Sequence, residues 1–372
     1  MILYIQARLI INDMDFEEVF SFENLKDCAR ACLKGVTWKQ STQTFEMDML
    51  QWVASLHRDL LDGKYRSKGF HKFQINDRGK TRNITSVHIS ERCVQKCLVQ
   101  YALKPLILPK LIYDNGATIE NKGTDFAIMR LREHLRWHMA RYGLKGGILT
   151  IDYHNYFGSI RHDILLDKLR NIIDDDRIYD LSEYFIRCFD GDIGIGLGSE
   201  ISQICAVFYP NDIDHMMKDK LKVHGYGRYM DDSYIISDDI SCLKEYLKII
   251  TDMSNTLGLE INPKRTQIVK FDGGHFSYLK KRIFMTDTHK IVMRLSRENI
   301  TKRRRLIGKQ NRLIDGGHMP IESQQMSFNS WKGHAIKYDS YKSIEALETE
   351  LITVPNIHTK PNKSQDDNTK GR

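Results

Sequence analysis

The stretch Gly227-Arg228-Tyr229-Met230-Asp231-Asp232-Ser233-Tyr234-Ile235-Ile236-Ser237 decides how this chain of 372 residues is interpreted. Its aromatic and β-branched residues favour two short strands, which places the adjacent acids Asp231 and Asp232 in a tight turn between them. Two adjacent carboxylates are costly to bury without partners, so they must face either water or a cation. An ordinary solvated hairpin turn is the simpler alternative, and the rest of the chain has to decide between the two.

The composition is that of a globular protein, with 41% hydrophobic and 28% charged residues. The length predicts two or three packed subdomains. Residues 1–11 are apolar but include Gln6 and Arg8 and lack a cleavage site, which indicates a strand or a buried helix start and not a signal peptide. No stretch has the length of a membrane span, so we expect no membrane partner. The seven cysteines form no CxxC motif, which favours buried apolar cysteines and a reducing cytoplasm over zinc sites or disulfides.

The net charge of +8 is concentrated in a basic run, which we define as Lys280–Arg312. It holds twelve Lys and Arg residues against only two acids, Asp287 and Glu298. Charge runs are usually solvated faces, but one this one-sided favours a surface that contacts the phosphates of a nucleic acid.

Hydrophobic periodicity predicts an alternation of helical and extended segments. Helices are expected at residues 15–63, 90–108, 161–173, 199–215 (interrupted near Pro210), 238–257 and after 296. Ser90 is the predicted N-cap of the second of these, with Glu91 in its first turn. Alternating apolar residues predict a hairpin over 66–88 with a basic turn, and short strands at 147–153 and within 259–271.

Asp152 ends the predicted strand at 147–153 and lies 79 residues before Asp231. A single acid at a strand end is usually a cap or turn residue. Acids from two strands that converge at one sheet edge, however, can bind a pair of Mg²⁺ ions, because hard cations prefer oxygen ligands. Such ions activate a 3′-hydroxyl group and hold a triphosphate together with the leaving pyrophosphate.

With these parts in this order, the chain resembles reverse transcriptases of the bacterial type, which include the enzymes of group II introns, retrons, diversity-generating retroelements and defence systems. The resemblance covers residues from about 63 to 341. It implies an α+β right-hand polymerase fold with fingers, a palm with an antiparallel sheet, and a helical thumb. The implied domains are an N-terminal helical extension at 1–62, fingers at 63–146, the palm with interleaved fingers elements at 147–285, the thumb at 286–353 and a disordered tail at 354–372.

The resemblance also implies roles for individual residues. The catalytic set is Asp152, Asp231, Asp232 and Lys264; the three acids bind two Mg²⁺ ions, for which Mn²⁺ is a substitute, and Lys264 protonates the leaving pyrophosphate. The implied dNTP contacts are Arg78, Lys80 and Arg82 of the hairpin, the backbone from Tyr153, Phe157 as a steric gate against the 2′-hydroxyl group, Gly198 and Gln203. The implied nucleic-acid contacts are Ser199, Ser202, Tyr229, Met230, Lys280, Arg303, Arg304 and Arg305.

Two motifs depart from the common pattern. The element Gly196–Gln203 ends in Ser-Gln where group II introns and most retrons have Ser-Pro, and in this it is similar to diversity-generating and abortive-infection-like enzymes. The segment Phe276–Lys280 resembles a variant of the primer grip. No HNH nuclease, maturase extension, RNase H acid set or protease is recognisable.

These features predict an RNA-directed DNA polymerase that takes an RNA template and dNTPs and releases a DNA product. The favoured role is anti-phage defence with a dedicated structured non-coding RNA. The alternative is a diversity-generating retroelement with an accessory protein, and a homo-oligomer is a further partner arrangement. An inactive RNA-binding scaffold is disfavoured by the intact acids. An RNA-dependent RNA polymerase is disfavoured by Tyr229-Met230 before the acids and by Phe157.

Overall fold

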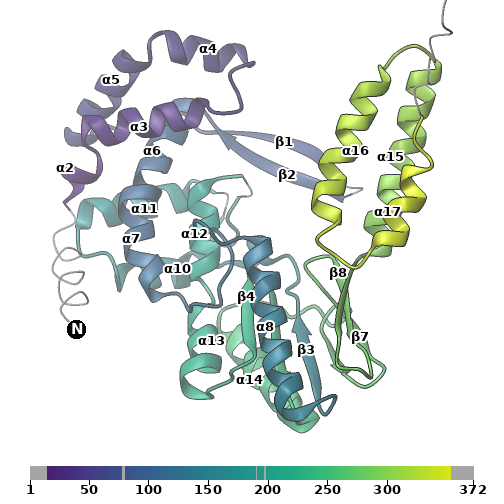
Figure 1. Ribbon diagram of the computed structural model, residues 1–372. Helices are drawn as coiled ribbons and strands as arrows, with labels where there is room; N and C mark the ends of the chain where they lie inside the picture. Colours follow the sequence, from purple (N-terminus) through teal and green to yellow (C-terminus); the bar gives the residue numbers. More distant parts are fainter. Residues whose placement is uncertain (1–14, 78–79, 190, 197, 353–372) are drawn as a thin grey trace, which may run out of the picture. The chain divides into compact units, whose positions relative to one another are not determined.

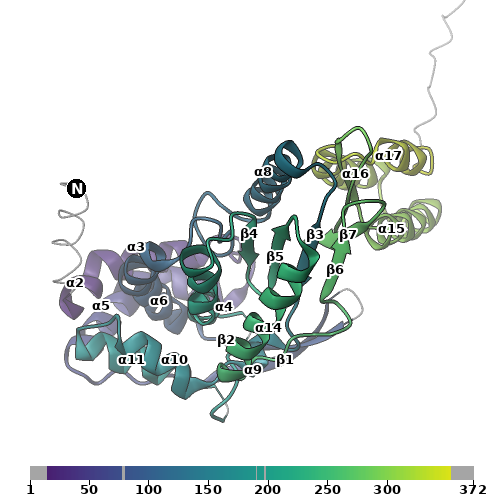
Figure 2. The ribbon, with the colours of Figure 1, turned by 90° about the horizontal axis from the view of Figure 1, so that it is seen from below.

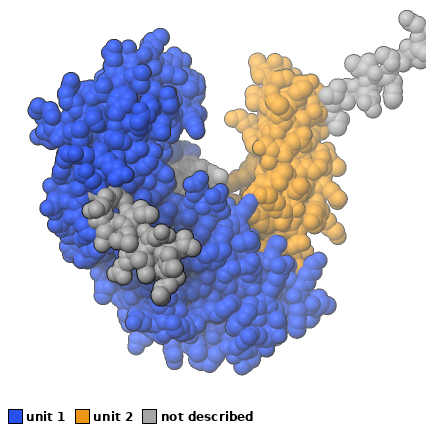
Figure 3. Space-filling view, turned by 60° about the vertical axis from the view of Figure 1, so that its left-hand side comes forward, with its two compact units in different colours: residues 1–279, 284–291 blue, residues 280–283, 292–372 orange. Residues whose placement is uncertain are grey.

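The computed structural model describes residues 15–77, 80–189, 191–196 and 198–352, so the predictions for residues 1–11 and for the tail at 354–372 lie outside the described residues. The chain divides into two compact units, coloured blue and orange in Figure 3. Unit 1 consists of the residues up to Leu279 together with Phe284–Ile291. Unit 2 consists of Lys280–Ile283 together with the residues from Val292 onward. All three acids of the predicted site belong to unit 1.

The first described residues of unit 1 form helices, as the periodicity predicted (Figure 1). Ser21 is the N-cap of the helix Phe22–Leu33, because its side chain accepts a hydrogen bond from the Asn24 amide at 3.4 Å. Leu25, Ala29 and Cys32 form its buried stripe. The helices are α2 (Phe16–Val19), α3 (Phe22–Leu33), α4 (Gln40–Met47) and α5 (Met49–Leu61).

The start of the next helix, α6 (Ile89–Leu98), differs from the prediction. His88 is the N-cap in place of Ser90, and its Nδ1 accepts a hydrogen bond from the Ser90 amide at 3.3 Å. Glu91 lies in the first turn as predicted, but it is buried and accepts a hydrogen bond from the Ser67 hydroxyl at 2.8 Å. Burial raises the pKa of Glu91 above its ordinary value.

The predicted hairpin is confirmed: β1 (Phe70–Asp77) pairs antiparallel with β2 (Lys80–Val87), from Phe70 opposite Val87 to Asp77 opposite Lys80. Helical structure continues beyond α6. The continuing segments are a π-helical turn η1 (Val99–Leu103), α7 (Lys104–Ile107) and a 3₁₀ turn η2 (Leu108–Lys110).

A four-stranded antiparallel sheet, in the order β4-β5-β3-β6, forms the centre of unit 1 (Figure 2). Its strands are β3 (Gly147–Ile151), β4 (Tyr226–Tyr229), β5 (Asp232–Ser237) and β6 (Gln267–Lys270). Every residue of β3 is buried, as expected for an inner strand that is covered on both faces. The helix α14 (Ile240–Thr256) packs against β3, β5 and β6, and α8 (Thr124–Tyr142) packs against β4 and β5.

Gly147, the first residue of β3, lies where two strands approach closely. A Cβ atom at this position would lie 2.3 Å from the Val269 carbonyl oxygen of β6 and 3.0 Å from Cδ1 of Ile240. Because the first of these obstacles is backbone, it cannot move aside as a flexible side chain would. A glycine therefore permits the pairing of β3 with β6 at this end.

The segment before α8 forms an isolated parallel bridge to β4, between Asn115 and Arg228. The Asp114 carbonyl accepts from the Arg228 amide at 3.1 Å, and the Gly116 amide donates to the Arg228 carbonyl at 3.0 Å. The buried Asp114 carboxylate also ties this segment to two helical elements, because it lies 2.5 Å from Nε of Arg130 and 2.7 Å from Nζ of Lys218. This network fixes α8 to the edge of the sheet.

Among the remaining helices of unit 1, three agree with predicted segments, including the interruption at Pro210, which precedes the first residue of α13. The helices at 124–142, 156–159 and 176–187 were not predicted. The remaining helices are α9 (Tyr156–Ser159), α10 (His162–Arg170), α11 (Asp176–Arg187), α12 (Glu200–Phe208), α13 (Asn211–His215) and the π-helical turn η3 (Met216–Lys220). Across the described ranges, no helix is both long and apolar enough to cross a lipid bilayer.

Unit 2 is mostly helical. A three-stranded sheet, β7 (His275–Tyr278), β8 (Lys281–Met285) and β9 (Ile291–Leu295), contains the boundary between the units. The helices that follow are α15 (Arg297–Asp315), α16 (Ile321–Ala335) and α17 (Tyr341–Glu348). Ser296 caps α15 by accepting from the Asn299 amide at 3.2 Å. The prediction of a basic helix after residue 296 is confirmed.

Arg303, predicted to contact nucleic acid, is instead buried within unit 2. Its guanidinium carbon lies 5.5 Å from the ring centre of Phe328 and 5.6 Å from that of Trp331, and both terminal nitrogens donate to the Ser327 hydroxyl at 3.3 Å. The prediction was wrong because a count of basic residues ignores the helix face, and Arg303 lies on the face that packs against α16. Arg304 forms an ion pair with Glu350 at 2.7 Å.

Arg303 and Arg305 offer a matched test of this assignment, since both are on α15 and only Arg305 is exposed. We expect Arg303→Ala to lower the free energy of unfolding by about 1–3 kcal/mol, through loss of buried stem and cation–π contacts. Arg305→Ala should change it by less than about 0.5 kcal/mol. Urea unfolding followed by circular dichroism measures both. Unchanged stability of the Arg303 variant, together with RNA affinity reduced as much as in the Arg305 variant, would place Arg303 on the surface after all.

Candidate active site

Three acids lie at one edge of the central sheet. Tyr229 of β4 pairs with Asp232 of β5, so Met230 and Asp231 form the two-residue turn between the strands. Met230 has φ of +55°, which is the left-handed conformation that a tight turn requires. On the other side of β5, Ile151 pairs with Ser233. Since the pairing is antiparallel, Asp152, the next residue after Ile151, lies level with Asp232.

Asp152 is held by a single segment that follows α14. Its Oδ2 accepts a hydrogen bond from Nδ2 of Asn262 at 3.0 Å, and its Oδ1 lies 3.6 Å from Nη1 of Arg265. Its backbone carbonyl accepts from the Asn262 amide at 2.8 Å, and the hydroxyl of Thr266 accepts from the Asp152 amide at 3.3 Å. The carboxylate is therefore fixed in orientation from both of its oxygens.

Only Lys264 of this segment was predicted to be a site residue, and Asn262 and Arg265 were missed. Lys264 is exposed, and its backbone amide donates to Oδ1 of Asn262 at 3.1 Å. Asn262 reaches Asp152 because Tyr153 pairs with Ile261, the residue before Asn262. Such a long-range pairing cannot be deduced from a motif alone.

Asp231 and Asp232 are half-buried, and their charges affect nearby phenols. Burial raises the pKa of Tyr156 well above its ordinary value, and the charge of Asp231 adds to this shift. Burial likewise raises the pKa of Tyr278, with Asp232 as the first of the charges that add to it. Both phenols therefore stay protonated and neutral beside the acids.

The donor set at this edge is made only of carboxylate oxygens, the ligands that Mg²⁺ and Mn²⁺ prefer. Within the residues that the structure describes, no group of three or more His, Cys, Asp or Glu side chains has the arrangement of a metal site. The chemistry of the three acids fits a divalent ion, and the fixed orientation of Asp152 fits the role of a ligand.

The residues that follow Asp152 only partly match their predicted roles. Phe157 on α9 is half-buried, with its ring 5.8 Å from that of Tyr156 in an edge-to-face contact. The side chain of Tyr153 is buried, and its hydroxyl lies 3.0 Å from that of Ser254. The His154 amide donates to the Glu260 carbonyl at 2.8 Å. At least this amide of the predicted triphosphate-binding backbone is therefore already used inside the protein.

The Gly196–Gln203 element also differs from its predicted role. Ser199 is buried, and its hydroxyl donates to Oε1 of Gln95 at 2.9 Å. Ser202 is also buried, so neither serine presents its side chain for the base or sugar contact that the motif had predicted. Gln203 is exposed. The motif predicts three polar contacts, but Ser199 is the buried N-cap of α12 and Ser202 lies on the buried face of that helix, which leaves Gln203 exposed.

A small cavity lies where this element meets α6 and β2, with a volume of about 160 Å³. Gly198, which has φ of +109°, lines it together with Ser199. Among the other lining residues are Ile84, Ser86, Arg92, Gln95 and Glu200.

The predicted phosphate contacts of the hairpin are described only in part. Arg78 lies outside the described residues, and the structure gives Lys80 and Arg82 by their backbone, which pairs with β1. Tyr229 is half-buried beside the turn. Lys280 is exposed between β7 and β8, where it has φ of +63°.

Comparison with known proteins gives one family. The family model described as "Reverse transcriptase (RNA-dependent DNA polymerase)" matches residues 70–308, which is more than half of the chain. No curated protein sequence matches.

Among solved structures, 251 chains match. One is telomerase from Candida albicans, solved in complex with the TWJ fragment of telomeric RNA; the match has 12% sequence identity and a TM-score of 0.46. It covers 65% of this chain and half of the telomerase chain. On the extent of the family match, with the antiparallel sheet that brings three acids together, this chain has the right-hand polymerase fold and belongs to the reverse transcriptase family.

Proposed function

We propose that this protein is an RNA-directed DNA polymerase that extends a primer with dNTPs on an RNA template. The observation that carries the proposal is the level position of Asp152 and Asp232 on neighbouring strands, with Asp231 in the adjoining turn. Membership of the reverse transcriptase family supports the same reaction.

In this proposal Asp152, Asp231 and Asp232 hold two divalent metal ions, Mg²⁺ with Mn²⁺ as a substitute. When bound, such ions lower the pKa of a primer hydroxyl and neutralise charge on the triphosphate. Asn262 and Arg265 keep the Asp152 carboxylate in one orientation. Lys264, exposed on the same segment, serves as the proton donor to pyrophosphate.

Asp231→Asn tests the metal-binding role. We expect DNA synthesis to fall by at least about 100-fold, because the substitution removes one charge from the metal ligands while keeping the shape of the side chain. The matched control is Asp252→Asn on α14, since Asp252 is an exposed acid of the same unit and should leave the rate unchanged. Primer extension on an RNA template measures both, and thermal unfolding verifies the fold. Full activity of Asp231→Asn would refute the assignment of the three acids.

We further propose that Phe157 lies beneath the sugar of the incoming nucleotide, five residues after Asp152. Phe157→Val should then admit ribonucleotides, because the ring that blocks a 2′-hydroxyl group is gone. The measurement compares incorporation of dNTPs and rNTPs by the wild type and the variant. Equal rejection of rNTPs by both proteins would exclude Phe157 as the gate. Efficient use of rNTPs by the wild type would instead indicate an RNA-dependent RNA polymerase.

The biological role that we propose is anti-phage defence in the cytoplasm, with a dedicated structured non-coding RNA as template; a diversity-generating retroelement with an accessory protein is the alternative. The basic run supports an RNA partner, because Arg305, Lys309 and Arg312 of α15 are exposed. We expect one RNA species to be strongly enriched when RNA that co-purifies with the protein is sequenced. Recovery of only random cellular RNA would count against both roles. The Asp231→Asn variant is the control here, because it should retain the same RNA.

A further inference from the structure

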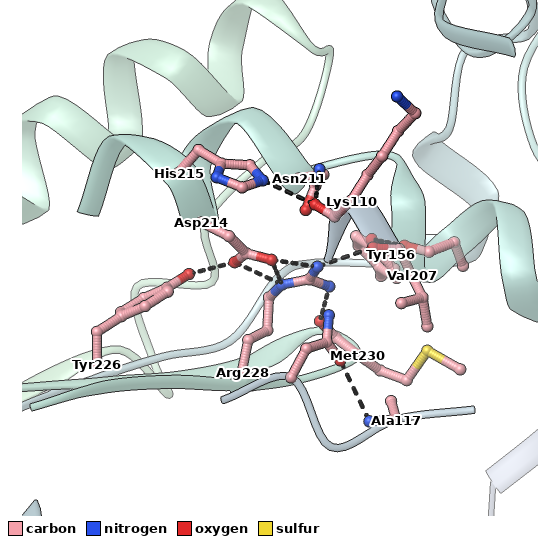
Figure 4. Close-up of polar contacts among 12 residues, drawn as sticks. Lys110, Ala117, Tyr156, Val207, Asn211, Asp214, His215, Tyr226, Arg228 and Met230 are labelled. Carbon is pink, nitrogen blue, oxygen red and sulfur yellow. Dashed lines mark hydrogen bonds and ion pairs between the residues drawn. The ribbon is translucent and has the colours of Figure 1, made fainter. Parts of the chain in front are cut away.

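A fully buried ion pair lies directly behind the acidic turn. Asp214 of α13 is 0% exposed and Arg228 of β4 is 2% exposed. The Arg228 guanidinium donates three hydrogen bonds to the carboxylate, from Nη2 at 2.6 Å and from Nε at 2.8 and 3.0 Å. The Tyr226 hydroxyl donates a fourth at 2.6 Å (Figure 4).

Stability alone does not explain such a pair. Removing two charges from water costs several kcal/mol for each ion, and replacing a buried pair by apolar residues of similar size is often neutral or stabilising. Burial disfavours the charged guanidinium, but Asp214 more than offsets this and raises the pKa of Arg228 above its ordinary value. Asp214 therefore keeps the Arg228 guanidinium charged in the interior. The other contacts of this guanidinium indicate what it does there.

Those other contacts lead to the turn. Nη1 of Arg228 donates to the Met230 carbonyl at 3.1 Å, and Nη2 donates to the Val207 carbonyl of α12 at 2.8 Å (Figure 4). The Met230 carbonyl belongs to the peptide that joins Met230 to Asp231. The guanidinium thus connects the backbone of the turn to two helices, α12 through Val207 and α13 through Asp214.

The turn needs such support. Met230 is in the left-handed conformation, which is unfavourable for a residue with a side chain. Neighbouring carboxylates at the turn also repel each other. The backbone of Arg228 is itself fixed, because its amide and carbonyl are bonded to Asp114 and Gly116. The fixed backbone of Arg228, its charged side chain and the left-handed Met230 therefore all lie within three consecutive residues.

We propose that Arg228 is a positioning residue for the acidic turn: it fixes the Met230–Asp231 peptide so that Asp231 and Asp232 face the metal ions, while Asp214 keeps the guanidinium oriented. This role rests on the proposed polymerase function. Arg228 itself touches neither metal nor substrate in this assignment, because it is buried behind the turn.

The test uses the double variant Asp214→Leu/Arg228→Met, which removes both charges and leaves neither unpaired. We expect it to fold with at most a modest fall in melting temperature, because no charge is left unpaired and only the buried Tyr226 hydroxyl loses its acceptor. Its affinity for Mn²⁺, titrated into the protein without nucleotide and followed by electron paramagnetic resonance, should fall by about 10- to 100-fold. The Mg²⁺ concentration for half-maximal DNA synthesis should rise in parallel.

The matched control is Lys218→Met, which removes a neighbouring ion pair with the Asp114 carboxylate and a hydrogen bond to the His224 carbonyl. It should leave Mn²⁺ affinity unchanged. If the double variant does not fold, Arg228→Lys replaces it, because a lysine can keep the bond to Asp214 but cannot also reach both carbonyl groups.

Wild-type Mn²⁺ affinity and wild-type Mg²⁺ dependence in a folded variant would overturn the proposal and leave the pair with a structural role only. If the proposed polymerase function is wrong, the experiment gives a different result. In that case the wild type itself makes no DNA, while the Mn²⁺ titration still shows whether Arg228 shapes the acidic turn.

Discussion

Electrostatic repulsion at one sheet edge is the constraint on which the rest of unit 1 depends. The antiparallel register of β3 with β5 places Asp152 level with Asp232, and the turn from β4 adds Asp231. Acids this close together are unfavourable without compensating positive charge or hydrogen-bond donors. The fold supplies one set of compensating groups for Asp152 and another for the turn that bears Asp231. Asn262 and Arg265 approach Asp152 from the segment after α14, and Arg228 supports the turn from beneath.

Many regular elements of this architecture could be predicted from the sequence, because their signals are local, but the helices α8 and α11 were missed. The hairpin of β1 and β2, the break at Pro210 and the helix α15 follow from period, turn residues and capping. The three acids could also be recognised, since two of them are adjacent in the sequence and the third ends a strand. That these acids face a common edge follows from the register, which the structure supplies.

The errors share a different cause. Ser199 and Arg303 were predicted to contact ligands because their residue types and neighbours fit a motif, yet the helix face decides whether a side chain meets solvent. His88 was missed as a cap because histidine is an uncommon residue at that position. Asn262, Asp214 and Arg228 were missed because each acts through a partner far away in the chain or through a backbone carbonyl. A sequence pattern describes the types of residues present, but the pairing of buried charges depends on the packed tertiary structure.

Gly147 shows that the geometry of the acids is also set at a distance from them. It begins the strand that leads to Asp152, and no side chain fits between it and the Val269 carbonyl. A larger residue there would clash with the backbone of β6 and shift β3, and Asp152 follows the other end of this short strand. A substitution at Gly147 would therefore impair the site much as a change of ligand would, without touching any ligand. Gly147 therefore helps to set the position of Asp152 from the opposite end of β3.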